Sequence, residues 1–176
     1  MARTTRRSAI RAEIRQQAGF RSPGQEATVA LLRTASVVGR VLARVLEPWA
    51  LSLAQYNALR IIRGAGAGGI ATLAIRERMI EEGTTITRLL DKLEDAGLVR
   101  RERTLPDRRQ VICYATPKGK RLLDTIDPTI DAADEAAVAV LSDDDRERFV
   151  ALLDAVRAAN VPRGAPRTLT RTLTGA

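Results

Sequence analysis

Apolar side chains recur at helical spacing in the first third of the chain. Between residues 26 and 47 they return every three or four positions, which predicts an amphipathic helix that Pro48 ends. The positions on its apolar face are Leu31, Ala35, Val38, Val41, Leu42 and Val45. A second helix is predicted next, because Ser52 and Gln55 have the spacing of a capping box and Gly64 supplies a stop.

The following stretch predicts a short helix and, soon after it, a longer one. The short helix covers residues 71–79, and its expected core contacts are Leu73, Ile75 and Met79. The longer helix follows a turn at Glu82-Gly83 and ends before Gly97, which suits the C′ position. At about 100° per residue, one of its faces is apolar and the other polar. The apolar face holds Ile86, Leu89, Leu90 and Leu93, and the polar face holds Thr84, Thr87, Arg88, Asp91 and Asp95.

Two extended segments come next, with a turn between them. Leu98 and Val99 begin the first strand, and Pro106-Asp107 marks the turn. The segment VICY at 111–114 is rich in β-branched and aromatic residues and indicates the returning strand. The sequence therefore predicts a β-hairpin whose tip carries arginines.

Two more helices are predicted after the hairpin. A threonine followed by a proline at 116–117 begins a long helix that extends to about Leu141 and is kinked at Pro128. Ser142 caps a last helix, which ends near Asn160. Elsewhere the chain is interrupted: the residues 22–24 break it after an Arg-rich start that could hold a short helix, and the glycine-rich residues 64–69 form a flexible connection.

The order of these elements predicts the fold and a class of partner. A short helix, a turn, a longer helix and a basic hairpin make up a winged helix-turn-helix, which binds double-stranded DNA. The longer helix fits the major groove, where Thr84, Thr85 and Thr87 allow close approach and Arg88 can reach a guanine edge or a phosphate. An ordinary solvated surface helix is the alternative, and the adjoining basic hairpin favours DNA binding.

Charge is distributed unevenly, and this supports the same interpretation. The formal net charge is +8, but residues 1–23 hold +5 of it and residues 161–176 hold +3. Within the body, residues 100–121 carry eight basic side chains against two acidic ones, whereas residues 122–160 carry three against ten. Such segregation indicates one basic surface that faces a polyanion and acidic helices that face away from it.

Three stretches resemble the MarR family of transcriptional regulators. They are LSLAQYNALRII from residue 51, TTITRLLDKLEDAGLVRRE from residue 84 and PDRRQVICYATPKGKRLL from residue 106, and the resemblance covers most of residues 26–160. It implies that Arg108 or Arg109 in the wing inserts into the minor groove and that Asp107 holds it. Further candidate phosphate contacts are Arg76, which stands where the family usually has Ala, Arg101 and Arg103.

The resemblance also implies a homodimer formed by interlocking terminal helices. The expected fold is mainly α with a small β wing, in which N- and C-terminal dimerisation helices accompany the winged helix-turn-helix lobe. The expected parts are a basic N-terminal arm over 1–25, a dimerisation helix over 26–47, the DNA-binding lobe over 48–117, C-terminal dimerisation helices over 118–160 and a basic flexible tail over 161–176.

A small aromatic or phenolic effector is a further implication of the resemblance. Trp49 and Tyr56, with Tyr114, could line a pocket between the dimer helices and the DNA-binding lobe, and packing in the core is the alternative for all three. Cys113 likewise has two interpretations, a redox sensor as in some relatives or an inert thiol. The second is favoured, because no partner cysteine and no obvious histidine or lysine neighbour lowers its pKa.

The composition lacks residue types on which most enzyme active sites depend. The 176 residues include no histidine and one cysteine, so the commonest general base and an intrachain disulfide framework are both missing. We therefore expect no enzyme, no cofactor and no metal site, and we attribute the aspartates at 143–145 to a helix N-terminus. We also expect a cytoplasmic protein without a membrane partner, because no apolar run is long enough to span a bilayer and the Arg-rich start lacks a secretory apolar segment.

The function that these observations predict is a sequence-specific regulator, more specifically a repressor, that binds a palindromic operator as a homodimer and is released by a small effector. The alternative is a constitutive architectural DNA-binding protein whose basic tails bind with little sequence preference.

Overall fold

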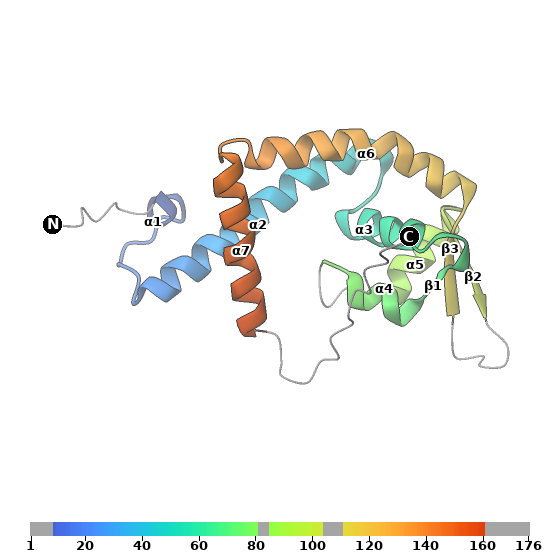
Figure 1. Ribbon diagram of the computed structural model, residues 1–176, viewed down its shortest axis with the longest axis horizontal. Helices are drawn as coiled ribbons and strands as arrows, with labels where there is room; N and C mark the ends of the chain where they lie inside the picture. Colours follow the sequence, from blue (N-terminus) through green and yellow to red (C-terminus); the bar gives the residue numbers. More distant parts are fainter. Residues whose placement is uncertain (1–8, 81–84, 104–110, 161–176) are drawn as a thin grey trace, which may run out of the picture. The chain divides into compact units, whose positions relative to one another are not determined.

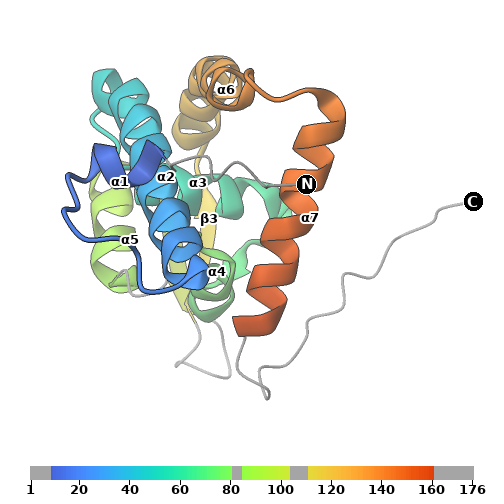
Figure 2. The ribbon, with the colours of Figure 1, turned by 90° about the vertical axis from the view of Figure 1, so that its left-hand side faces the viewer.

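The computed structural model describes residues 9–80, 85–103 and 111–160. The chain divides into two compact units, residues 1–135 and residues 136–176. In the first unit, some of the helices lie beside a small antiparallel sheet (Figure 1), and Figure 2 shows the same ribbon turned by 90°, with the strand β3 of this sheet labelled. The predicted class, mainly α with a small β wing, is confirmed.

The N-terminal helices are α1 (Ala9–Glu13) and α2 (Pro23–Leu46). The Ser22 hydroxyl accepts a hydrogen bond from the backbone N–H of Gln25 at 3.1 Å, and Pro23 occupies the first turn. The predicted interruption is present but ends at Ser22: Pro23 and Gly24 already belong to α2, because proline lacks the N–H that would be unsatisfied in the first turn of a helix. After α2, Pro48 lies in the short 3₁₀ helix η1 (Glu47–Trp49).

The helix α3 (Leu53–Gly64) begins with the predicted capping box. The backbone N–H of Ser52 donates to Gln55 Oε1 at 2.9 Å, and the backbone N–H of Gln55 donates to Ser52 Oγ at 3.2 Å. The glycine-rich connection that follows is structured, with the 3₁₀ helix η2 (Gly66–Gly68) and the strand β1 (Ile70–Ala71). Its Gly69 has φ +65°, and a Cβ there would lie 2.5 Å from Cε1 of Tyr114, so the turn into β1 requires glycine.

The rest of the lobe follows the predicted order: α4 (Thr72–Arg78), α5 (Ile86–Asp95), β2 (Val99–Arg103) and β3 (Val111–Ala115). The sheet has the strand order β1-β3-β2, and both pairings are antiparallel. Arg101 of β2 stands opposite Cys113 of β3. The strand β1 was not predicted from the sequence.

One hydrophobic core holds the lobe together. Its most deeply buried side chains include Leu59, Ile62, Ile75, Leu90, Leu93, Val99, Leu123 and Ile126. Of the three core contacts predicted in α4, Ile75 is fully buried and Met79 packs against the core, but Leu73 is 55% exposed. The prediction for Leu73 is wrong, because a helix of seven residues buries only one narrow face.

The helix α6 (Pro117–Val138) is attached to the end of α5 by a group of polar contacts. The Thr116 hydroxyl accepts from the backbone N–H of Gly119 at 3.0 Å and donates to the Gly97 carbonyl at 2.7 Å. The ammonium of Lys118 donates to the Ala96 carbonyl at 2.8 Å, and Gly97 has the φ of +69° expected at a C′ position. The start of α6 is therefore fixed to the C-terminus of α5.

Gly119 allows this close approach, and its replacement by alanine is expected to destabilise the fold. A Cβ at Gly119 would lie 2.3 Å from the Leu98 carbonyl oxygen, so the backbone itself would have to shift. Overpacking of this kind costs about 1–3 kcal/mol, which lowers the melting temperature by roughly 2–12 °C in a chain of this size. Gly64→Ala is the matched control, because nothing lies within 4 Å of its would-be Cβ. Equal melting temperatures for the two variants in circular dichroism would contradict this prediction.

The second unit contains α7 (Asp143–Asn160). Its start is capped as predicted, since the backbone N–H of Asp145 donates to Ser142 Oγ at 3.2 Å. Within the part of the chain that the structure describes, none of the α7 residues is buried. Its exposed apolar side chains are Phe149, Val150, Leu152 and Val156, and those of α2 are Leu31, Leu32, Val37 and Val41.

None of the described helices combines the length and the apolar character that crossing a membrane requires.

Candidate nucleic-acid interface

The helix α5 presents its polar side chains to solvent and buries its apolar face. Leu89 is 6% exposed, and Leu90 and Leu93 are fully buried, as the periodicity predicts. On the opposite face, Thr87 and Arg88 are exposed, and Thr85 is exposed at the residue before the helix. Three of the predicted site residues are therefore accessible to solvent at the start of α5, whose apolar face packs against the core.

The remaining predicted groove contacts fall in segments that the structure leaves out. Thr84 precedes α5, and Asp107, Arg108 and Arg109 lie between β2 and β3, all of them outside the described residues. Their roles stay predictions from the sequence.

Arg101 is held by two carboxylates of α5. Its Nη2 lies 2.6 Å from Asp91 Oδ1 and 2.5 Å from Glu94 Oε2, and its Nε donates to Glu94 Oε2 at 2.7 Å. The backbone N–H of Arg101 donates to the other oxygen, Glu94 Oε1, at 3.0 Å. The hydrogen bond to Glu94 is the main cause that raises the pKa of Arg101 above its usual value, so the guanidinium stays charged.

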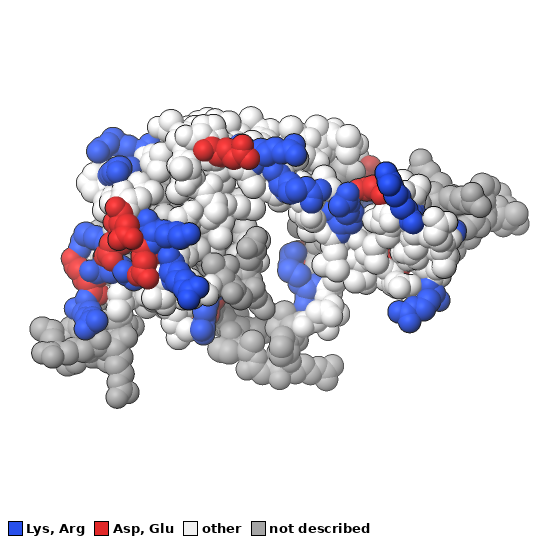
Figure 3. All heavy atoms as spheres, turned by 180° about the vertical axis from the view of Figure 1, so that it is seen from behind, with Lys and Arg blue, Asp and Glu red and all other residues white. Residues whose placement is uncertain are grey.

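Arg76 and Arg103, the other two predicted phosphate contacts, are exposed on α4 and at the end of β2. Arg100 points to the other side of β2, where its guanidinium lies 4.0 Å from the centroid of the Tyr114 ring and pairs with Glu102. Figure 3 shows that Lys and Arg side chains gather over the lobe that carries the wing, with acidic side chains between them. The surface around α5 is thus basic but not uniformly so.

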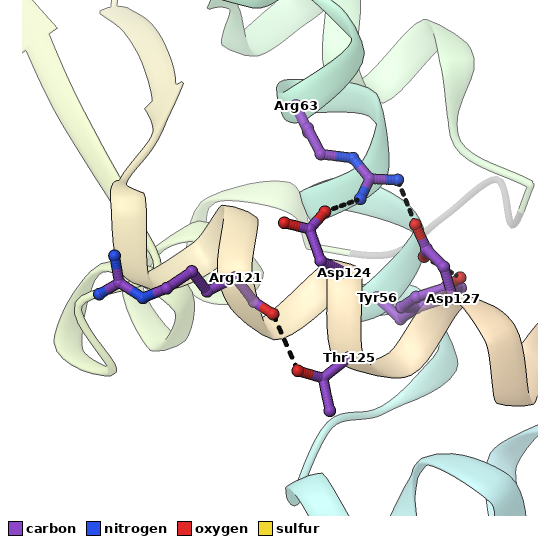
Figure 4. Close-up of polar contacts among 6 residues, drawn as sticks. All are labelled: Tyr56, Arg63, Arg121, Asp124, Thr125 and Asp127. Carbon is purple, nitrogen blue, oxygen red and sulfur yellow. Dashed lines mark hydrogen bonds and ion pairs between the residues drawn. The ribbon is translucent and has the colours of Figure 1, made fainter.

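Tyr56 belongs to a polar network between α3 and α6, which Figure 4 shows. Its hydroxyl donates to Asp127 Oδ1 at 2.9 Å, and Arg63 reaches Asp127 Oδ2 at 2.5 Å and Asp124 Oδ1 at 3.4 Å. Burial, followed by the hydrogen bond to Asp127, raises the pKa of Tyr56 to about 12. The Tyr56 side chain is 3% exposed and lies in the core, against which Trp49 is packed half-buried.

The hydrogen bond between Tyr56 and Asp127 affects how Tyr56 could contribute to the expected effector pocket. Because the Tyr56 hydroxyl is already bonded to Asp127, a ligand would have to displace that hydrogen bond to use it. The network was not anticipated from the sequence, although Asp124 and Asp127 recur at helical spacing on α6. The described residues contain no group of three or more His, Cys, Asp or Glu side chains that could hold a metal ion.

Cys113 is fully buried in β3, with its sulfur 3.8 Å from the Thr72 hydroxyl. Burial raises the pKa of its thiol above the usual value, which keeps it protonated near neutral pH. We expect a thiol-specific reagent to label the native chain at least about 100-fold more slowly than the unfolded chain, since only the thiolate of an accessible cysteine reacts. Rapid native labelling, or a peroxide-induced loss of DNA binding that Cys113→Ser abolishes, would contradict this.

Several known proteins are similar to this chain in sequence and in fold. The model of the MarR family matches residues 51–111. The chain is 33% identical over 103 residues to the transcriptional regulator HosA of Escherichia coli O157:H7, a match that covers 58% of this chain and 75% of HosA. It is also 33% identical to a MarR transcription factor of Planctomyces limnophilus, whose crystal structure matches with a TM-score of 0.60 over 78% of this chain and 99% of that one. The crystal structure of the S. aureus MepR–DNA complex has the same fold, with a TM-score of 0.68 at 22% identity over 74% of this chain and 96% of that chain.

Proposed function

Because the chain belongs to the MarR family of transcriptional regulators, we propose that it binds an inverted-repeat operator as a homodimer and acts as a repressor. The observation that carries the proposal is the exposure of Thr85, Thr87 and Arg88 at the start of α5, whose apolar side chains pack against the core. MepR, which shares the fold, was crystallised in complex with DNA, and this supports the same kind of partner for this chain.

Two parts of the lobe have different roles in the proposal. The threonines and Arg88 of α5 meet base edges in the major groove and supply sequence discrimination. Arg108 or Arg109 of the wing, fixed by Asp107, contacts the narrow minor groove, and the exposed Arg76 and Arg103 contact phosphates. Phosphate contacts position the protein, whereas base-edge contacts select the site.

The homodimer is supported by the apolar side chains of α2 and α7. Phe149, Leu152, Leu153 and Val156 recur with i, i+3, i+4, i+7 spacing on α7, yet none is buried within the single chain. An exposed apolar stripe of this kind marks a site of contact with another protein surface. A two-fold dimer that buries it also presents two recognition helices, whose half-sites lie about one helical turn apart.

The proposal also includes repression of transcription and the relief of that repression by a small effector. A dimer that covers an operator blocks transcription by occupancy alone, without any additional activity. A small aromatic or phenolic molecule that competes for the surroundings of Trp49 and Tyr56 would act on the joint between α3 and α6, where Tyr56 and Asp127 are bonded.

Selection of bound fragments from genomic DNA, followed by footprinting, tests the proposal. We expect a protected inverted repeat whose half-site centres are roughly 10 base pairs apart. Diffuse protection over unrelated fragments would favour the architectural alternative and refute the proposal. Addition of small aromatic acids and phenols to the footprinted complex then tests the effector separately.

A further inference from the structure

Arg101 connects the helix proposed to enter the major groove with the first strand of the wing. Glu94 of α5 is fully engaged by it: one carboxylate oxygen accepts from the Arg101 backbone and the other from both Nε and Nη2. Asp91, one turn earlier on α5, accepts from the same Nη2 at 2.6 Å. The charged group of one strand residue is thus bound by two successive turns of the recognition helix.

The direction in which the Arg101 side chain points follows from its position in the strand β2. Side chains alternate along β2, so Arg101 shares its face with the buried Val99, toward the core and α5. Only 24% of the Arg101 side chain is exposed, compared with 48% for Asp91 and 37% for Glu94. The guanidinium is thus partly shielded while both carboxylates stay accessible to solvent, and the hydrogen bonds between the charged groups give the contact a definite geometry.

The chemistry of the contact requires arginine in particular. A guanidinium presents several N–H groups in one rigid plane, which allows Nε and Nη2 to bind Glu94 while Nη2 also reaches Asp91. A lysine ammonium would keep the charge, but it has a single nitrogen and no fixed plane, so it cannot reproduce the contact that two nitrogens make with Glu94.

We propose that Arg101 is a positioning residue for DNA recognition: it fixes α5 relative to the wing strands, so that base-edge and wing contacts are made at the same time, and it does not itself bind phosphate. This replaces the phosphate contact predicted for Arg101 from the sequence, and it rests on the proposed function. Arg101 also neutralises two carboxylates on the helix that approaches the DNA, which would otherwise oppose the phosphates.

Substitutions that preserve charge separate positioning from phosphate binding. R101K should reduce the ratio of affinities for the selected site and a random duplex by about ten-fold, because misplaced base contacts are lost while general electrostatic attraction remains. R100K is the matched control: the same replacement on the same strand, at an exposed arginine whose side chain points away from α5, should leave the ratio unchanged. E94Q is isosteric, removes the charge of Glu94 and replaces one of its two acceptor oxygens with an NH2 group. It should lower the ratio, as R101K does.

Each variant of the full chain is titrated against both duplexes at several salt concentrations, well below its melting temperature. A ratio that R101K and E94Q leave within about two-fold of the wild-type ratio overturns the inference. So does an E94Q variant that binds both duplexes more tightly by the same factor, since Arg101 would then be a plain electrostatic contact. If R101K does not fold, E94Q decides. A wild-type chain that binds both duplexes equally would instead refute the proposed function.

Discussion

Leu152→Glu is expected to convert the protein to a monomer and to weaken operator binding by at least about 100-fold. Full burial of a leucine side chain contributes roughly 1.5–3 kcal/mol, and a buried unpaired carboxylate costs several kcal/mol more. Two-fold symmetry repeats each loss in both protomers. Leu152 is 59% exposed in the single chain, so the substitution leaves the monomer fold unaffected.

Ala158→Glu on the same helix is the control for this prediction. At about 100° per residue, Ala158 lies half a turn away from Phe149 and therefore opposite the apolar stripe. Sedimentation at micromolar concentration, followed by titration of the operator, should give a monomer with weak binding for Leu152→Glu and wild-type behaviour for Ala158→Glu. A Leu152→Glu dimer with unchanged affinity would show that α7 does not form the interface.

Arg88→Ala should remove sequence discrimination with little effect on general DNA affinity. A good side-chain contact to a base edge contributes about 1–3 kcal/mol of discrimination, or roughly 5- to 150-fold in affinity for the operator. Arg88 is exposed on the same face as Thr87, and Thr87→Ala should act in the same direction with a smaller effect.

Asp95→Asn serves as the comparison, since Asp95 is exposed in the last turn of α5, far along the helix from its groove-facing start. Binding to operator and to random DNA is measured for each variant at several salt concentrations. If Arg88→Ala weakens both equally and reduces the salt slope by about one, Arg88 is a phosphate contact and not a base contact.

Helix periodicity and capping predicted most of the lobe. Ile86, Leu89, Leu90 and Leu93 form one face at 3.6-residue spacing, and the structure packs that face against the core. The Ser52 capping box was also predicted correctly, because both of its hydrogen bonds join residues three positions apart. Local signals of this kind depend only on neighbouring residues, so one sequence suffices to find them.

Features that depend on distant residues were missed. The strand β1 has two residues, Ile70 and Ala71, which is too short to show an alternating pattern, and it exists because β3 pairs with it. The exposure of Leu73 could not be settled from a helix of fewer than two turns. Both elements are defined by the packing around them and not by their own sequence.

The ion pairs of Arg101 could have been predicted in part from the sequence. Asp91 and Glu94 are spaced i, i+3 and must share a face of α5, and alternation along β2 places Arg101 on the side of Val99. These two patterns together could have indicated an ion pair. Basic residues in a wing are more readily interpreted as phosphate contacts, so the sequence alone favours that role for Arg101.

Recognition of a particular DNA sequence by this protein can be measured in a competition titration. The wild-type chain is titrated with its selected inverted repeat and with a scrambled duplex of the same length and base composition, at about 150 mM salt, near physiological ionic strength. We expect the repeat to be bound at least about 1,000-fold more tightly than the scrambled duplex. Equal affinity for the two duplexes would contradict sequence-specific recognition by this protein.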